Sequence, residues 1–172
     1  MFDPTIYDNI KVVLEGAVYD YDLEGRIIIT RREDRIDLSS MSRTFAIEFA
    51  RSADKPSRAE IYLHVHLSDL AAEILENPNA KPGCTLLIKF YASINEPDRD
   101  CPKIDAGLSA IWAHRPQITQ QLSYTYGQPE KTYRNQITLS FGRKVDESQL
   151  DDFPDLITHA LESLIWLDER KE

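Results

Sequence analysis

The stretches TFAIEFA at residues 44–50 and EIYLHVHL at residues 60–67 decide the fold of this chain. In both of them apolar and polar side chains alternate, which is typical of a β-strand with one face in a core. The turn residues DKPS at 54–57 lie between them and predict an antiparallel hairpin. Because the side-chain period is two, both apolar rows must lie on the same side of that hairpin. The other side then carries Glu48, Glu60, Tyr62, His64 and His66.

Further strands are predicted on both sides of this hairpin. Residues 10–19 fit a helical stripe as well as strand alternation, and their β-branched content favours the strand. The turn DLEG at 22–25, with Gly25 in its left-handed position, would join that strand to the next one as a hairpin. The other predicted strands are residues 26–30, 84–94, 118–126 and 133–141. Together with the central hairpin they make about seven strands, most of them linked as hairpins.

Two main helices are predicted. Ser68 is a suitable N-cap for a helix whose buried stripe would consist of Leu70, Ala71, Ile74 and Leu75. The acidic sequence DDFP at 151–154 predicts the start of a helix near the C-terminus. Hairpin-linked strands with two helices packed on one face define an α+β class with a mainly antiparallel sheet.

The remaining segments are predicted to be short or irregular. The turn-rich sequence EPDRDCPK at residues 96–103 favours an exposed loop. A short helix is expected around residues 108–112, ended by Pro116. At the N-terminus, Asp3 and Pro4 are suited to cap a short helical turn.

Composition predicts one water-soluble globular domain that spans residues 1–172. The chain is 42% hydrophobic and 28% charged, and no repeat or linker divides it. Its net charge of −9 argues against general nucleic-acid binding, which depends on neutralising phosphates. No apolar run approaches the roughly 18 residues of a membrane span. With only 2 cysteines, the sequence favours the reducing cytoplasm.

Two groups of residues are candidates for ligand binding. His64 and His66 are two apart on a strand, so both imidazoles could reach one metal ion, with Glu48 or Glu60 of the hairpin as an oxygen ligand. A zinc site that adds Cys84 and Cys101 has the right chemistry, but Cys84 is in phase with core residues. A second group, around a possible turn at residues 33–34, could bind a small anionic metabolite and consists of Arg31, Arg32, Arg35 and Arg43. Interleaved acidic residues favour surface ion pairs instead.

The sequence contains no dinucleotide-binding glycine motif, P-loop, nucleophile elbow or zinc-protease motif, and no cofactor is expected. Tyr62 and Tyr91 lie on the polar side of the predicted sheet, and tyrosine is common at protein interfaces. These observations favour a non-enzymatic module that forms a homodimer or binds another protein. A metal-dependent hydrolase built on His64 and His66 is the alternative, and binding of an anionic metabolite by the arginines is a further one.

Overall fold

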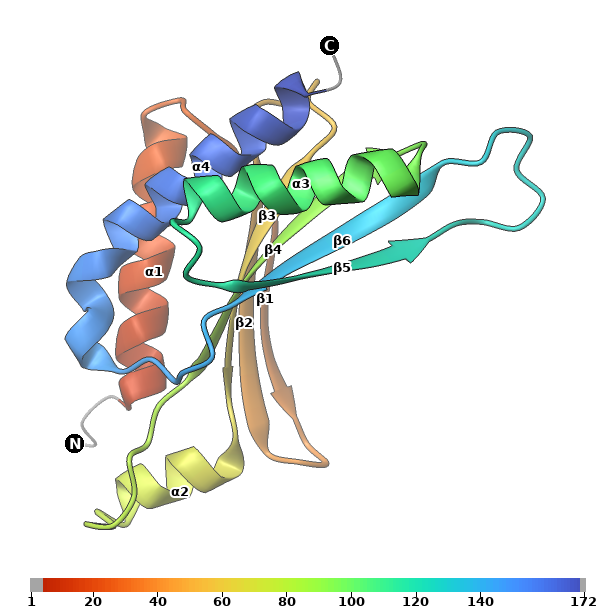
Figure 1. Cartoon of the computed structure of the whole chain (residues 1–172). Coiled ribbons are helices and arrows are strands. Elements are labelled where there is room, and N and C mark those ends of the chain that lie inside the picture. The colour runs from red at the N-terminus through yellow and green to blue at the C-terminus, as the bar shows by residue number, and fades with distance from the viewer. Residues whose placement is uncertain (1–4, 171–172) are drawn as a thin grey trace.

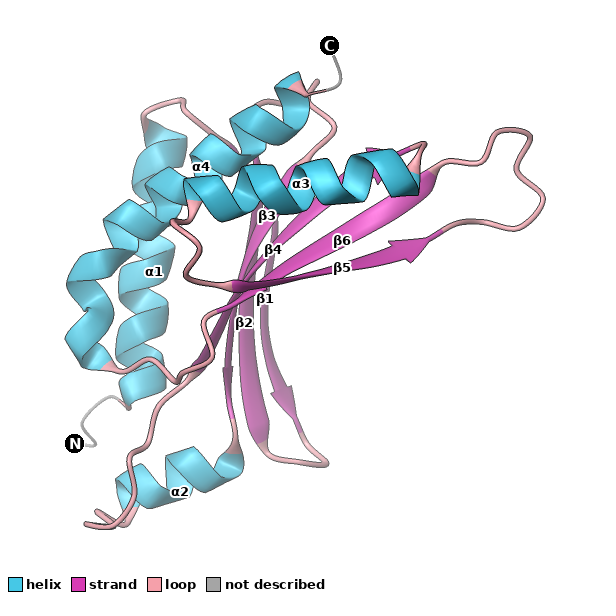
Figure 2. Ribbon diagram, in the orientation of Figure 1, coloured by secondary structure: helices cyan, strands magenta, loops and turns pink. Residues whose placement is uncertain are grey.

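The computed structural model describes residues 5–170, and within them a six-stranded antiparallel sheet carries helices on one face (Figures 1 and 2). The strand order is β1-β2-β3-β4-β6-β5. The strands are β1 (Ile28–Asp37), β2 (Ser42–Ala50), β3 (Arg58–Val65), β4 (Thr85–Ile94), β5 (Gln117–Ser123) and β6 (Tyr133–Ser140). The helices are α1 (Ile6–Leu23), α2 (Leu67–Ile74), α3 (Pro97–Ile111) and α4 (Phe153–Glu169), and a 3₁₀ helix, η1 (Glu147–Asp152), precedes α4. The α+β class is therefore confirmed.

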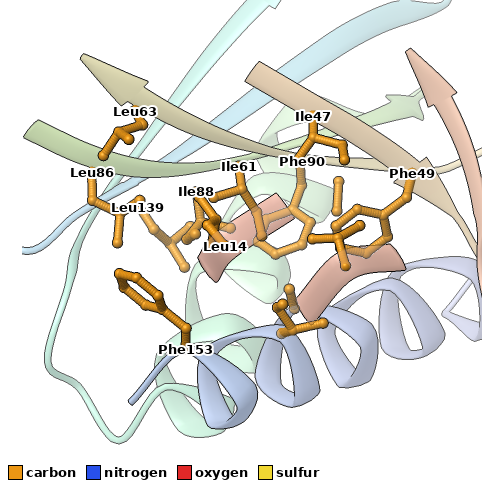
Figure 3. Close-up of a cluster of buried hydrophobic side chains, with 14 of the residues drawn as sticks. Leu14, Ile47, Phe49, Ile61, Leu63, Leu86, Ile88, Phe90, Leu139 and Phe153 are labelled. Carbon is orange, nitrogen blue, oxygen red and sulfur yellow. The ribbon is translucent and has the colours of Figure 1, made fainter. Parts of the chain in front are cut away.

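The central hairpin is confirmed as the antiparallel pair β2 and β3. Phe45 pairs with Leu63 and Ile47 with Ile61, so both apolar rows lie on the same side. These side chains are fully buried, and Figure 3 shows Ile47 and Ile61 beside Phe90 of the neighbouring strand β4. The hairpin predicted near the C-terminus is confirmed as β5 and β6, and β6 also pairs with β4.

Three helices, α1, α3 and α4, cover the apolar face of the sheet (Figure 2). Leu14 of α1, Leu108 of α3 and Phe153 of α4 are all buried against the strands in one continuous core. Burying a side chain of this size contributes about 1.5–3 kcal/mol. The sequence predicted two main helices on this face, but only α4 of these two lies there. Helix α1 comes from a segment expected to be a strand, and α3 from an expected loop and the short helix predicted around residues 108–112.

Residues 10–19 form part of helix α1, so the predicted strand there is wrong. A capping box between Thr5 and Asp8 starts the helix. Tyr7, Ile10, Leu14 and Val18 then form a buried stripe at helical spacing. Val12, which the strand pattern required on the same face as Ile10, is 65% exposed. Gly25 does adopt a left-handed conformation, with φ of 71°, but at the end of a helix rather than in a hairpin.

Residues 97–103 open helix α3, so most of the predicted exposed loop at 96–103 is helical. Pro97 occupies the first turn, where a missing amide hydrogen costs nothing. Asp98 and Asp100 complement the partial positive charge of the helix N-terminus, and the Asp100 carboxylate accepts a hydrogen bond from the Glu96 backbone at 3.2 Å.

Helix α2 exists, but its buried face is not the predicted one. Its N-cap is His66 rather than Ser68. Ile74 and Leu75, expected in the buried stripe, are 69% and 77% exposed. The buried residue is Asp69, which binds Lys144 at 2.6 Å and accepts the Gly83 amide at 3.2 Å. Together with a 2.8 Å hydrogen bond from the Ile6 amide to Glu73, these polar contacts attach α2 to the body of the protein.

Each described helix is too short or too polar to cross a membrane. The helical turn predicted at Asp3 and Pro4 lies outside the described residues.

Candidate functional site

The candidate site is the face of the sheet opposite α1, α3 and α4, which no described helix covers (Figure 2). We call the outward side chains of the six strands the uncovered face. Its basic side chains are Arg31, Arg35, Arg58, Lys89 and Arg134, and its acidic ones are Glu33, Asp37, Glu48 and Glu60. The two signs nearly balance there, whereas the whole chain carries a net charge of −9.

Glu60 lies at the centre of the uncovered face and is only 3% exposed. Its carboxylate binds the Arg31 guanidinium at 2.5 Å and lies 3.8 Å from the Lys89 ammonium group. The Tyr91 hydroxyl donates a hydrogen bond to it at 3.3 Å. Burial and the nearby Glu60 charge raise the pKa of Tyr91 to about 12. The buried carboxylate on β3 is thus neutralised by partners from two other strands, β1 and β4.

Three aromatic rings continue from this centre towards α2, and we call them the aromatic ladder: Tyr62, His64 and His66. The Tyr62 and His64 rings are stacked with centroids 6.2 Å apart, and the His64 and His66 centroids are 4.6 Å apart. Thr44 on β2 forms a 2.8 Å hydrogen bond with Nδ1 of His64. The ladder joins the uncovered face to the first residue of α2.

The structure does not bring Glu48 to the histidine pair. Glu48 is paired with Glu60, and the cross-strand neighbour of His64 is Thr44. The Glu48–Glu60 pair and the Thr44–His64 pair are four positions apart along the strands, which corresponds to a separation of about 13 Å. Residues 5–170 contain no cluster of three histidine, cysteine or acidic side chains that could hold a metal ion. His64 and His66 are adjacent, as predicted, but they have no third ligand among these residues.

The two cysteines are also unsuited to be zinc ligands. Cys84 is completely buried, as its phase with the core residues predicted, and burial raises the pKa of its thiol to about 12. Cys101 lies on α3 rather than in a loop, and its pKa is raised by burial and by Asp100. Neither thiol favours the thiolate form that zinc requires.

The four arginines of the predicted anion site are divided between the two faces of the sheet. Arg31 and Arg35 point outwards, whereas Arg32 and Arg43 point towards α1, where they bind Glu15 and Asp8. Consecutive strand residues point to opposite faces, so Arg31 and Arg32 cannot share a ligand. Arg35 binds Glu33 at 3.3 Å. Each arginine therefore has a carboxylate partner, but only Arg31 and Arg35 pair with one of the interleaved acidic residues, Glu33.

Sequence reasoning did not single out Lys89 or Arg134. The Arg134 guanidinium lies 5.0 Å from the centre of the Tyr91 ring, and Lys89 lies 4.2 Å from that of Tyr62. Alternation within β4 does place Lys89 and Tyr91 on one side of that strand. Their proximity to Glu60 follows only from the register between β3 and β4.

A second surface feature adjoins the aromatic ladder. We call it the apolar end, and it consists of Ile36, Leu38, Met41, Leu67, Ile74 and Leu75. All six side chains are at least half exposed. Arg43 pairs with Val65, so the residues before β2 and those after β3 lie at the same end of the sheet. Figure 1 shows the turn between β1 and β2 and helix α2 at that end.

We predict that His64 makes the stability of the protein depend on pH. Burial and the neighbouring His66 lower the pKa of His64 below its ordinary value of 6.5. The unfolded chain therefore takes up this proton first, so the free energy of unfolding falls as the pH decreases from about 6.5 towards the lower folded pKa. Urea unfolding between about pH 7.5 and pH 5 would measure this change.

The matched variant is His64→Gln, whose amide can still bond to Thr44 but does not titrate. We expect its free energy of unfolding to change less over the same pH interval. Equal slopes for the variant and the natural chain would contradict the assignment to His64.

No family model matches this chain, and comparisons with the curated proteins and with the solved structures found no match. Function is therefore inferred from the residues and their geometry.

Proposed function

We propose that this chain is a non-enzymatic module that associates with a second copy of itself through the apolar end and the adjoining aromatic ladder. The observation that carries the proposal is the apolar end. Leu38 is 82% exposed and Leu75 is 77% exposed, although both are side chains that usually contribute to a core. Exposed apolar side chains gathered in one region are typical of protein interfaces.

Charge favours a second copy as the occupant. Two chains that each carry −9 repel one another over most of their surfaces. The uncovered face beside the apolar end has nearly balanced charges, so two copies can approach there with little repulsion. A twofold interface places the same patch on both partners, and a patch with both signs of charge is self-complementary.

The two tyrosines have different expected roles in this interface. Tyr62 belongs to the aromatic ladder and lies towards the apolar end, so we expect it to contact the partner. Tyr91 donates a hydrogen bond to Glu60 and lies under the Arg134 guanidinium, so we expect it to fix the positions of these two side chains on the uncovered face.

We predict that the double variant Leu67→Asp/Ile74→Asp is monomeric where the natural chain is dimeric. Two carboxylates buried in an apolar interface would weaken association by at least about 30-fold, the effect of losing one strong interface contact. Light scattering coupled to size exclusion, from about 1 µM to 300 µM protein, would measure the mass.

The control is Val12→Asp/Leu23→Asp, which makes the same kind of change on the exposed side of α1. This variant should remain dimeric, and circular dichroism should show that both variants are folded. A natural chain that stays monomeric at the highest concentration would disprove self-association. If both variants lost the dimer equally, the interface would not lie at the apolar end.

A further inference from the structure

A pocket of about 360 Å³ lies away from the uncovered face, where the end of α3, the end of β6 and the start of α4 meet. This volume is within the range of small-molecule sites in proteins. Its floor is apolar and largely aromatic, formed by Trp112, Phe141, Phe153 and Leu156. No residue of the uncovered face, the aromatic ladder or the apolar end lines it.

The aromatic floor is held in a defined orientation. The Trp112 indole donates a hydrogen bond to Oγ of Ser163 at 2.9 Å, and that hydroxyl donates to the His159 carbonyl oxygen at 2.8 Å. The Phe141 ring lies edge-on to Trp112 with centroids 5.9 Å apart, and the His159 ring is 5.3 Å from Trp112. Fixed rings lose little freedom when a ligand packs on them.

The backbone is strained at the rim of the pocket. Ala113 and His114, directly after α3, both have positive φ, 52° and 57°, which is uncommon for residues other than glycine. Gly142, between two lining residues, has φ of 68°. Two consecutive left-handed residues cost free energy, and such conformations are concentrated at ligand sites.

The rim carries two arginines without carboxylate partners. Arg115 and Arg143 both line the pocket, and neither forms an ion pair with any residue between 5 and 170. Asp152, the N-cap of α4, and Asp155, in its first turn, line it as well, and neither forms an ion pair with any residue between 5 and 170. There the partial positive charge of the helix N-terminus stabilises carboxylates. The formal charges of the two arginines and the two aspartates cancel, and the partial positive charge of the helix N-terminus adds a small positive excess at the rim.

From these observations we infer that the pocket binds a small organic anion with an aromatic body, such as an aryl carboxylate. The ring would pack on Trp112 and Phe141, and the carboxylate would be bound by the guanidinium groups of Arg115 and Arg143. Arginine suits this role because its planar group donates two parallel hydrogen bonds to a carboxylate. The inference is independent of self-association, because it uses neither the apolar end nor the uncovered face.

The test compares three probes of the same shape, 3-phenylpropionate, its neutral amide and 3-phenylpropylamine. Tryptophan fluorescence reports binding because Trp112 forms part of the floor, and amide shifts in nuclear magnetic resonance spectra locate it. We expect saturable binding of the carboxylate, with an affinity at least about tenfold higher than that of the amide, since charge-assisted hydrogen bonds are the stronger kind. The amine should bind most weakly.

Two variants make the test specific. Arg115→Gln/Arg143→Gln should lower the affinity for the carboxylate to that for the amide and leave the amide unaffected. Arg134→Gln, an exposed arginine on the uncovered face, should change neither affinity. No saturable binding, equal affinities for the three probes, or an unchanged carboxylate affinity in the double variant would each overturn the inference. Shifts confined to residues outside the pocket would overturn it too.

Discussion

Replacing Gly107 by alanine should destabilise the protein, although alanine is normally the better helix residue. Gly107 lies in α3 directly under Trp166 of α4, and a methyl group there would lie 2.2 Å from Cζ2 of the indole and 2.6 Å from Cε2. Alanine gains at most about 1 kcal/mol in helix propensity. Forcing the two helices or the indole apart costs about 1–3 kcal/mol, or more. We therefore expect the urea midpoint to fall.

Gly16→Ala provides the matched control for this substitution. Gly16 is also inside a helix, α1, but no atom lies within 4 Å of the added methyl group. This variant should gain about 0.5–1 kcal/mol, because only the propensity changes. If Gly107→Ala were stabilised as much as Gly16→Ala, the close contact between α3 and α4 would be disproved.

Local features of the fold were predictable from the sequence, whereas pairings between distant segments were not. The hairpin of β2 and β3 was predictable because its alternation and its turn lie within about 25 consecutive residues. The position of β6 between β4 and β5 was not predictable. Its pairing with β4 joins segments separated by α3 and β5, and neither strand's pattern specifies its neighbour.

The incorrect prediction of a strand at residues 10–19 shows that β-propensity determines local structure less strongly than packing does. Val12 and Val13 favoured the strand, yet both are exposed on α1. A better signal was present, since Thr5 and Asp8 have capping-box spacing ahead of a stripe that begins at Tyr7. In the same way, Pro97 followed by acidic residues indicated a helix start rather than a loop.

For the candidate site, the alternation of side chains predicted which face of the sheet a residue lies on. It did not predict which residues of the other strands lie beside it. Tyr62 and His64 do share one side of β3, as their spacing required. The arginines were grouped around a turn expected at residues 33–34, but these residues lie inside strand β1, where consecutive side chains such as Arg31 and Arg32 point to opposite faces. The contact between Glu48 and the histidines failed for a different reason, because the register between β2 and β3 places Thr44 opposite His64.

Glu60→Ala should be the most damaging substitution on the uncovered face. The lost carboxylate binds Arg31 and Tyr91 and lies near Lys89, which has no other carboxylate partner within residues 5–170. Removing one partner of a fully buried ion pair costs about 3–5 kcal/mol. Arg31 is 47% exposed and keeps Glu33 and Glu48, so water and these residues compensate in part. We therefore expect a loss of about 2–3 kcal/mol in urea unfolding.

Glu60→Gln separates the charge from the shape of the side chain. The amide fills the same space and can still accept the Tyr91 hydrogen bond, so we expect roughly half the loss of the alanine variant, about 1–1.5 kcal/mol. Glu33→Ala is the control, because Glu33 also binds Arg31, at 3.1 Å, but is more exposed. An exposed pair contributes at most about 1 kcal/mol. If Glu33→Ala cost as much as Glu60→Ala, burial would not be what makes the Glu60 network important, and the uncovered face would behave as an ordinary solvated surface.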